Sequence, residues 1–322
     1  MKKTLIIFLL IAFSLMGYAE PFAPVGTSVA QFLTIGVGGR EVAMGEAVTA
    51  SSIGAGSVFW NPAGLVDGAS NDVYAAYNKW PAGIHLGAVA YAYTNERLGT
   101  FSLNAKYLNF GEMEVTTVEN PNGTGDMLQM SNYAIGLSYG RYLTDKVSMG
   151  LTAKLVNEKY GEHGYSTVAW DVGLIYRSDF KNFKIGMSIQ NFSGKVQFSG
   201  TFIDYSYSNS YLTGTEIEFD EWSLPMTFRF GAAIDLINEG SNKLIAAIDM
   251  VHPNDNVEQY NIGLEYAFDN MVFLRAGYKI SSYEGGLSGG IGFKMNMIIL
   301  DYALTNLGNL GITNRLSLAV NI

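Results

Sequence analysis

Apolar and polar side chains alternate with a period of two from Asn71 to the end of the chain, in segments separated by turn sequences. This period is that of a β-strand with two unlike faces, and it excludes a helical fold for most of the molecule. Fourteen segments show it, at about residues 71–80, 83–94, 98–110, 128–142, 146–159, 165–178, 182–193, 224–237, 242–252, 256–268, 271–281, 286–295, 297–306 and 311–322. Such lengths suit tilted membrane-spanning strands, and fourteen is even, as single-chain bacterial barrels require.

The first 19 residues have the parts of a secretory signal peptide. Lys2 and Lys3 precede an apolar run from Leu5 to Met16, and the site Gly17-Tyr18-Ala19, with small residues at its first and last positions, leads to a cleavage site before Glu20. A lone transmembrane helix is the alternative, but the run is short of the roughly 20 residues that a span needs. We therefore expect an exported protein from which residues 1–19 are removed.

The two faces of the alternating segments differ in polarity. In residues 165–178 one face carries Trp170, Val172, Leu174 and Tyr176, and the other carries Asp171, Gly173 and Arg177. Residues 224–237, 256–268 and 271–281 separate in the same way. A soluble β-sandwich would also alternate, but it does not normally need fourteen such strands after a signal peptide. The pattern predicts an all-β fold, a 14-stranded antiparallel transmembrane β-barrel in the bacterial outer membrane.

The intervals between the segments provide a separate test of an up-and-down barrel. Every second interval is a short turn, at residues 95–97, 143–145, 179–181, 238–241, 269–270 and 296. The two long intervals, Gly111 to Met127 and Gly194 to Ser223, both belong to the other set. Outer-membrane barrels have short periplasmic turns and long external loops, so the two long intervals are predicted to lie outside the cell.

The composition agrees with a barrel and argues against nucleic acid as a partner, against disulfides and against thiolate metal sites. The chain has 37 Gly, 20 Tyr, 18 Phe and 4 Trp; Tyr and Trp favour membrane interfaces, and Gly suits a crowded barrel interior. The formal net charge of −9 becomes more negative without the two leader lysines, which argues against nucleic acid as a partner. The chain has no Cys, so disulfides and thiolate metal sites are excluded.

Residues 31–66 are the one long segment without strand-like alternation. The segment is too rich in Gly and Ala to build its own core and too apolar to be a free linker, so the rest of the fold must bury it. Asn61 before Pro62 predicts a short helix from Pro62 to about Val66, and residues 42–49 are predicted to form another. We expect residues 20–70 to form a lead-in and a hatch inside the lumen of a barrel of residues 71–322.

Three motifs lie in this segment: Gly36-x-Gly38-x-Arg40, Ala43-Met44-Gly45-x-Ala47 and Asn61-Pro62-Ala63-Gly64-Leu65. They resemble the start of PorV/PorQ family proteins, which are related to the FadL-type fatty-acid transporters of bacterial outer membranes. The resemblance implies a 14-stranded barrel with an N-terminal hatch, no enzymatic activity and no cofactor. The hatch residues that it marks are Gly36, Gly38, Arg40, Met44, Gly45, Asn61, Pro62, Ala63 and Gly64.

Ten charged residues are expected to face the lumen: Lys154, Asp171, Arg177, Arg229, Asp235, Asp249, Glu265, Arg275, Lys279 and Asp301. They form either a pathway through the barrel or a network of paired charges that fixes the hatch and satisfies its backbone. A fatty-acid route would need a continuous apolar pocket, and this lumen is too charged for most of its length.

The longest outer interval carries four aromatic residues among small polar ones: Phe202, Tyr205, Tyr207 and Tyr211. Tyr and Ser in such a mixture suit a binding surface, because Tyr offers a large contact area at a small cost in entropy. The interval either binds a partner or folds back over the barrel mouth.

Catalysis and metal binding have little support in the sequence. The chain has three histidines, His85, His163 and His252. His163 is near Ser166 and Asp171, but neighbouring strand residues face opposite sides and no nucleophile motif surrounds the serines. Residues 285–292 are Gly-rich but lack the Lys-Ser/Thr ending of a phosphate loop, so they are predicted to be a strand whose small inward residues leave room for the hatch. No catalytic or metal-binding residue is assigned.

Two functions remain open. The resemblance implies a type IX secretion component that receives C-terminal signal domains of exported cargo and delivers them to surface attachment machinery. The alternative is a FadL-like passive transporter of hydrophobic small molecules, which would need an apolar tunnel and a gap in the wall. The expected partners are outer-membrane lipid, secreted C-terminal domains and attachment-complex proteins, and not nucleic acid.

Overall fold

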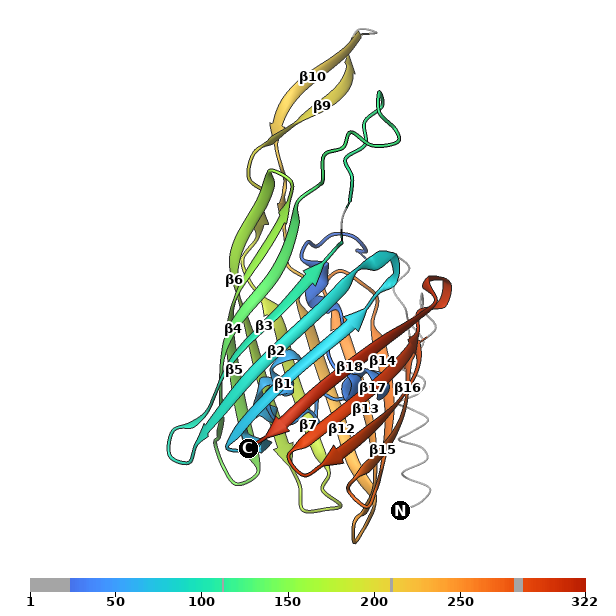
Figure 1. Ribbon diagram of the computed structural model, residues 1–322. Coiled ribbons are helices and arrows are strands. Elements are labelled where there is room, and N and C mark those ends of the chain that lie inside the picture. The colour runs from blue at the N-terminus through green and yellow to red at the C-terminus, as the bar shows by residue number, and fades with distance from the viewer. Residues whose placement is uncertain (1–23, 112, 209–210, 281–285) are drawn as a thin grey trace, which may run out of the picture.

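The computed structural model describes residues 24–111, 113–208, 211–280 and 286–322, so the expected signal peptide lies outside the described residues. Within these residues fourteen strands close an antiparallel barrel (Figure 1). They are β1 (Asn71–Lys79), β2 (His85–Asn95), β3 (Gly99–Asn109), β4 (Met130–Tyr142), β5 (Val147–Tyr160), β6 (His163–Arg177), β7 (Lys184–Phe192), β12 (Thr227–Glu239), β13 (Asn242–Pro253), β14 (Gln259–Phe268), β15 (Val272–Ile280), β16 (Gly286–Met295), β17 (Ile298–Asn306) and β18 (Ile312–Asn321). The predicted 14-stranded antiparallel barrel is confirmed.

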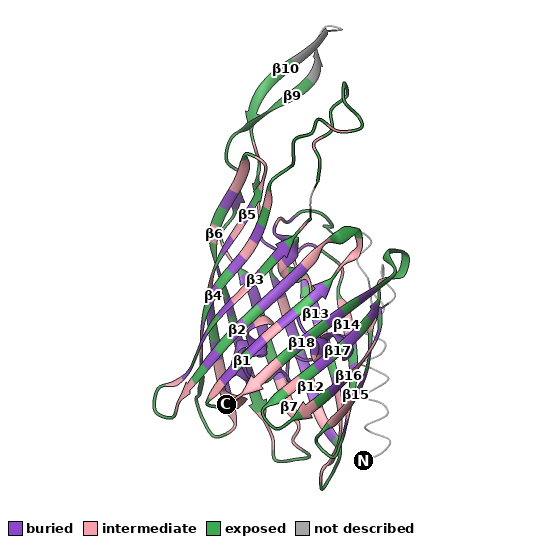
Figure 2. Ribbon diagram, in the orientation of Figure 1, coloured by how far each residue is buried: buried purple, intermediate pink, exposed green. Residues whose placement is uncertain are grey.

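Each barrel strand pairs with its neighbours in the sequence, β7 pairs with β12 across the long interval, and β1 pairs with β18 to close the sheet. Closure leaves no free strand edge in the barrel wall. The β6–β7 ladder contains an irregularity between Trp170 and Val172. Burial alternates along the strands, as the change of colour in Figure 2 shows.

The outward face of the wall is apolar. Trp170 is 51 % exposed, whereas its neighbour Asp171 is 2 % exposed and points inward. Leu174, Leu264 and Leu274 are also exposed on the outside, as the alternation predicts. Hydrocarbon chains of a bilayer would cover such a face, and the buried charges are kept in the lumen.

The two ends of the barrel differ in the length of their connections. Short turns join β2 to β3, β4 to β5, β6 to β7, β12 to β13, β14 to β15 and β16 to β17 at one end, where the C terminus also lies (Figure 1). We call this the inner end. The opposite, outer end carries residues 110–129 and 193–226 (Figure 1). Asp269, Asn270 and Asn296 in the short turns adopt positive φ angles, which Asn and Asp tolerate better than most residues.

The longer outer connection contains secondary structure that the sequence analysis did not predict. The strands β9 (Thr201–Ser208) and β10 (Tyr211–Glu218) pair as a two-stranded sheet, and β8 (Val196–Gln197) pairs with β11 (Glu221–Trp222) at its base. Figure 1 shows the β9–β10 hairpin pointing away from the barrel. The hairpin therefore does not fold back over the mouth, whereas the base of the interval does pack there: Val196 and Leu224 are buried in one cluster with Ala30 and Phe32 of the N-terminal segment.

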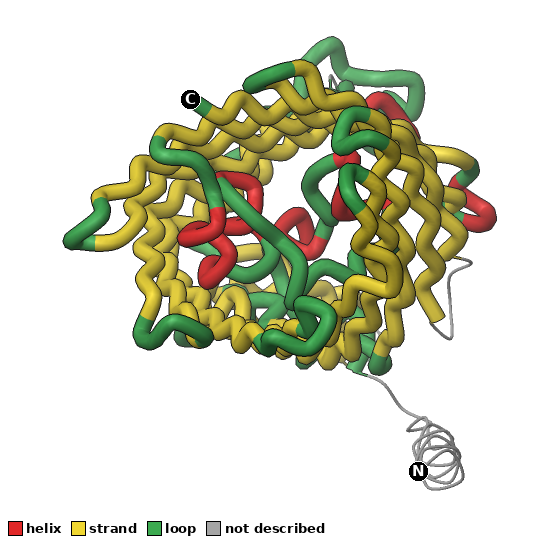
Figure 3. Tube along the Cα trace, turned by 90° about the horizontal axis from the view of Figure 1, so that it is seen from below, coloured by secondary structure: helices red, strands yellow, loops and turns green. Residues whose placement is uncertain are grey.

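Residues 28–68 pass through the lumen as the hatch (Figure 3). They include η2 (Gln31–Thr34), α2 (Gly39–Ala43), η3 (Ala55–Phe59) and η4 (Pro62–Asp67). At the outer end Ser28 bridges to Ser223, and at the inner end Asp67 pairs with Arg177. Two further 3-10 turns, η5 (Pro81–Gly83) and η6 (Gly308–Leu310), lie in outer connections. No helix in the described ranges has the length and apolar character needed to cross a membrane.

The expected helix at residues 42–49 is wrong. The helix α2 spans Gly39–Ala43 instead, and the chain then turns at Gly45 and Glu46, which both have a φ of 63°. A left-handed pair of residues cannot continue a right-handed helix, and Gly45 lowers the cost of that turn. The helix expected after Pro62 is present, as the 3-10 helix η4.

Candidate functional site

The wall of the barrel approaches the hatch backbone closely at inward-facing glycines. A Cβ atom added at Gly277 would lie 2.0 Å from the Gly45 nitrogen, and one at Gly186 would lie 2.3 Å from the Thr49 carbonyl oxygen. The same crowding occurs at Gly150 against Pro62 and at Gly290 against Ala43. Only glycine lets the wall meet the hatch this closely, and within the Gly-rich segment predicted to leave room for the hatch this holds at Gly290.

A chain of buried ion pairs fixes the helix α2 to the wall. Arg40 Nε lies 2.9 Å from Glu265 Oε2, and Arg275 Nε lies 2.6 Å from the same oxygen. Arg275 Nη1 also lies 2.6 Å from Asp301 Oδ1. Because each charge has an opposite charge at hydrogen-bond distance, the network can exist in a buried position, and removal of one member would leave another unpaired.

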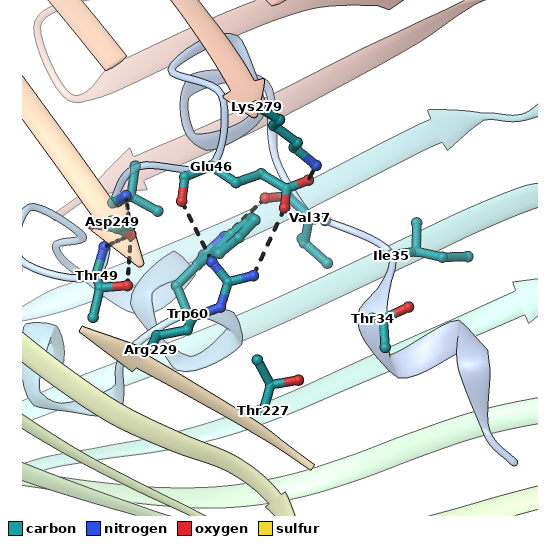
Figure 4. Close-up of polar contacts among 12 residues, drawn as sticks. Thr34, Ile35, Val37, Glu46, Thr49, Trp60, Thr227, Arg229, Asp249 and Lys279 are labelled. Atoms are coloured by element: carbon teal, nitrogen blue, oxygen red, sulfur yellow. Dashed lines mark hydrogen bonds and ion pairs between the residues drawn. The ribbon is translucent and has the colours of Figure 1, made fainter. Parts of the chain in front are cut away.

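A second group of charges holds the turn after α2 (Figure 4). Glu46 Oε1 lies 2.5 Å from Lys279 Nζ, and Glu46 Oε2 lies 3.7 Å from Arg229 Nη2. Asp249 accepts hydrogen bonds of 3.0 and 2.9 Å from the backbone N–H groups of Val48 and Thr49. These contacts satisfy donors of the irregular backbone, which has few partners of its own.

The inward charges predicted from the sequence therefore fall into two sets. Arg177, Arg229, Asp249, Glu265 and Lys279 contact the hatch directly, and Arg275 and Asp301 complete its network. The remaining three pair within the wall. Lys154 lies 2.8 Å from Asp171, and Asp235 lies 3.0 Å from Lys243.

Other wall residues that bind the hatch were not predicted. Lys106 donates hydrogen bonds of 2.9 and 2.7 Å to the carbonyls of Leu33 and Ile35. Glu158 accepts one of 2.7 Å from the Ala30 N–H, and Asp72 accepts one of 2.7 Å from the Ala55 N–H. For Lys106 the sequence contained a signal, because strand alternation places Lys106 on the same face of its segment as Leu108, and both are buried.

Asn61 is the most connected residue of the hatch motifs. Its Oδ1 accepts a 3.1 Å hydrogen bond from the Ala63 N–H, which caps η4 as predicted from the sequence. Its Nδ2 also donates to the Thr49 carbonyl at 2.7 Å. Ser148 of the wall donates to the Ala63 carbonyl at 3.0 Å. The motif thus joins two parts of the hatch to the wall.

The glycines of the hatch motifs serve close approach and turns. Gly38 has a φ of 97°, in the region that favours glycine. A Cβ at Gly36 would lie 2.3 Å from Glu46 Oε1, and one at Gly64 would lie 2.2 Å from the Ser52 carbonyl oxygen. Met44 is fully buried, with its backbone carbonyl against Gly263.

Within the described residues, the hatch borders two larger cavities, one toward each end of the barrel. The outer cavity has a volume of 320 Å³ and is bordered by Glu46 and Trp60 of the hatch and by the outer ends of β17 and β18. The inner cavity has a volume of 560 Å³ and is bordered by Arg40 of the hatch and Asp235 of the wall. Charged side chains line both, which does not suit a continuous apolar route.

The aromatic residues predicted in the outer interval are only partly brought together. Phe202 lies 5.1 Å from Phe219 between ring centroids, and Phe219 in turn lies 6.0 Å from Phe198. Tyr205 is 63 % exposed on the hairpin. Tyr207 and Tyr211 belong to the strands β9 and β10.

The three histidines make separate contacts: His85 with Tyr77, His163 with Ser199, and His252 with Glu258. The described part of the chain contains no group of three or more His, Asp or Glu placed to hold a metal ion. Ser166 and Asp171 lie on opposite sides of the wall, so they do not form a Ser–His–Asp arrangement with His163.

A family model described as type IX secretion system protein PorV matches residues 23–253. The chain belongs to the PorV family. No curated protein matches its sequence. The match covers the hatch and the first nine barrel strands, together with the outer hairpin. It confirms the family to which the hatch motifs pointed.

Solved structures show which fold this PorV-family chain shares. The CymD monoaromatic hydrocarbon channel has a TM-score of 0.62 at 12 % identity, over 89 % of this chain and 98 % of that one. The Pseudomonas putida toluene transporter TodX has a TM-score of 0.59 at 15 % identity, over 89 % and 98 %. A Pseudomonas aeruginosa FadL homologue has a TM-score of 0.55 at 9 % identity, over 89 % and 99 %. At these identities the likeness establishes the FadL-like fold and nothing finer.

Proposed function

We propose that this chain is a closed outer-membrane barrel of type IX secretion, which receives C-terminal signal domains of exported proteins at its outer end and passes them to surface attachment machinery. The family match supports the secretion context. The observation that carries the proposal is the fastening of the hatch to the wall by buried charges on several strands, from Arg177 near the inner end to Lys279 toward the outer end. A hatch fixed to the wall in this way leaves the outer connections as the surface for a protein partner.

The β9–β10 hairpin is the proposed contact for the exported domain. It projects from the barrel (Figure 1) and exposes Ile203 and Tyr205, with 55 % and 63 % of their surface accessible. A two-stranded sheet also offers strand edges to which an extended partner segment can add. Exposed aromatic and aliphatic side chains on such a support are common anchors of protein–protein contacts.

The alternative function is passive transport of a hydrophobic small molecule. Its support is the fold shared with a toluene transporter and a hydrocarbon channel. The lining of the lumen argues against it, because both cavities are bordered by charged side chains such as Arg229 and Arg275.

The test is a pull-down from the native membrane with the tagged full chain and with a variant in which residues 199–220 are replaced by a short Gly-Ser linker. The full chain is expected to retain exported proteins through their C-terminal domains, and the variant is expected to lose them. A matched control shortens the other outer loop at residues 115–125. Co-purification of a lipid or hydrocarbon, without exported domains, would contradict the proposal and favour transport.

A further inference from the structure

The outer cavity has three cationic side chains in its lining and two carboxylates, Glu46 of the hatch and Asp255. Arg229 is on β12, Lys279 on β15 and Arg315 on β18, and β15 lies midway between the other two strands in the barrel order. Glu46 of the hatch contacts Lys279 at 2.5 Å and Arg229 at the longer distance of 3.7 Å. Asp255 accepts hydrogen bonds from Ser28 and Gln31 and forms no ion pair with the three cations within the described residues, so Glu46 faces more positive charge than it can balance.

Arg315 is the cation with the least compensation. It is 3 % exposed, and its hydrogen bonds within the described ranges go to the hydroxyls of Thr305 and Thr313, at 2.8 and 3.2 Å. None of the acidic side chains in those ranges forms an ion pair with it. A buried guanidinium group without an ion-pair contact is costly, so it indicates a place for an anion.

Unpartnered donors in the cavity lining lead to the same conclusion. Among the described residues, the buried polar atoms of this lining that have no hydrogen-bond partner are Arg229 Nε, Arg315 Nε and Trp80 Nε1. All three are donors, and Arg229 is 7 % exposed. Buried donors normally find an acceptor, so the lining is complementary to a ligand rich in acceptor oxygens.

Glu46 indicates which anion fits. Its carboxylate already lies between Lys279 and Arg229, and the Arg229 guanidinium is 5.0 Å from the centre of the Trp60 ring (Figure 4). Two oxygens of a carboxylate match the planar donors of arginine. A volume of 320 Å³ holds a small ligand or the end of a peptide.

We propose that the outer cavity is a binding site for the carboxylate of a small organic acid or of a peptide C terminus, held by Arg315, Arg229 and the indole N–H of Trp80. This site is additional to the proposed contact at the β9–β10 hairpin, and it stands whether or not that contact carries exported domains. A ligand there would share Arg229 with Glu46, so its carboxylate would lie next to the turn of the hatch.

The first experiment is a calorimetric titration of the purified full chain in detergent with three probes: acetyl-Ala-Ala-Ala with a free C terminus, the same peptide as its C-terminal amide, and sodium acetate. Saturable binding of the free acid without binding of the amide is expected. Acetate that binds as tightly as the peptide would assign the site to small acids, and a tighter peptide would assign it to chain ends. Equal binding of acid and amide, or no binding of either carboxylate, would overturn the proposal.

The second experiment repeats the titration on variants. Trp80→Phe removes the indole N–H and keeps a ring, and Arg315→Gln removes the charge; each is expected to weaken binding of the acid about tenfold or more. Arg141→Gln, which changes an exposed arginine near the inner end of β4, is the matched control and should bind as the natural chain does. Heat-modifiable gel mobility would establish that each variant is folded. Unchanged affinity in both Trp80→Phe and Arg315→Gln would refute the assignment.

Discussion

At Glu265, two guanidinium groups from different parts of the chain meet one carboxylate. Arg40 comes from the hatch and Arg275 from the wall, and all three side chains are largely buried. A buried ion pair contributes little net stability over an apolar pair of the same shape, but the loss of one partner is costly because the other charge stays unpaired. The network therefore determines where α2 lies in the lumen more than it stabilises the barrel.

Glu265→Gln is expected to loosen the hatch and leave the barrel closed. Arg40 would lose its counter-charge, whereas Arg275 would keep Asp301, so the cost is of order 3 kcal/mol and falls on α2. Hydrogen exchange at residues 39–49 should become much faster in the variant. Asp179→Asn is the control, because the Asp179–Lys146 pair is exposed and its loss should change nothing measurable. Equal exchange in the two variants would contradict this role of Glu265.

Asn61→Ala is expected to destabilise the inner half of the hatch. The cap on Ala63 alone is worth about 1 kcal/mol, and the lost bond to the Thr49 carbonyl should raise the total to about 2 kcal/mol. Limited proteolysis should then cut residues 49–66 faster, while the strands remain protected. Asn95→Ala removes a similar cap from a turn outside the lumen and should leave the hatch unchanged. A hatch as resistant in Asn61→Ala as in the natural chain would show that the cap is dispensable.

At the scale of elements, the barrel strands were predictable from the sequence, whereas the individual contacts between the wall and the hatch were not. Alternation located the ends of β6 within two residues and those of β14 within three, because each strand has a lipid face and a lumen face of opposite polarity. Pairs such as Arg40 with Glu265 depend on how a segment without periodicity lies in the lumen, which no local pattern encodes. The left-handed turn at Gly45 and Glu46 ended a helix that composition alone would extend.

The β9–β10 hairpin was missed for a different physical reason. Its strands bury little surface, so neither face is consistently apolar: Ile203 and Tyr205 alternate with Phe202 and Asp204, and all four are exposed. Strand prediction from periodicity relies on one buried face. The residue types at 209 and 210, Asn and Ser, are common in turns, and they were the remaining local signal for a hairpin in the sequence.

Single-cysteine labelling is expected to assign the two ends of the barrel. The natural chain has no Cys, so a single introduced cysteine is the one thiol that a maleimide can label. Asn120→Cys and Lys195→Cys lie in the outer connections, and a membrane-impermeant maleimide should label both on intact cells. Asn95→Cys and Asp145→Cys, at the short turns, should react only after the outer membrane is broken. Labelling of the second pair on intact cells would mean that the barrel is oriented the other way.

At the scale of the whole molecule, the wall and the hatch contribute different properties. The wall is a closed ladder from β1 to β18, so its hydrogen bonds do not depend on the hatch. The hatch contributes part of the apolar interior, since Val42, Met44, Ala47, Val48 and Trp60 are buried in one cluster with residues of the wall, and a second cluster also joins hatch and wall. The wall should therefore insert without the hatch, and the hatch should decide whether the lumen conducts.

Deletion of residues 31–66 is expected to give a barrel that inserts and conducts ions in planar bilayers. The wall groups that now bind the hatch, such as Asp249, Lys106 and Arg275, would face a water-filled lumen, where charged groups are well solvated. Heat-modifiable mobility should show that the deleted chain still closes, and the full chain measured beside it should not conduct. Failure of the deleted chain to fold would mean that the buried cluster is part of the barrel's own core. If the variant without residues 31–66 inserts but does not conduct ions, the hatch is not the plug. The seal would then have to lie at the outer connections.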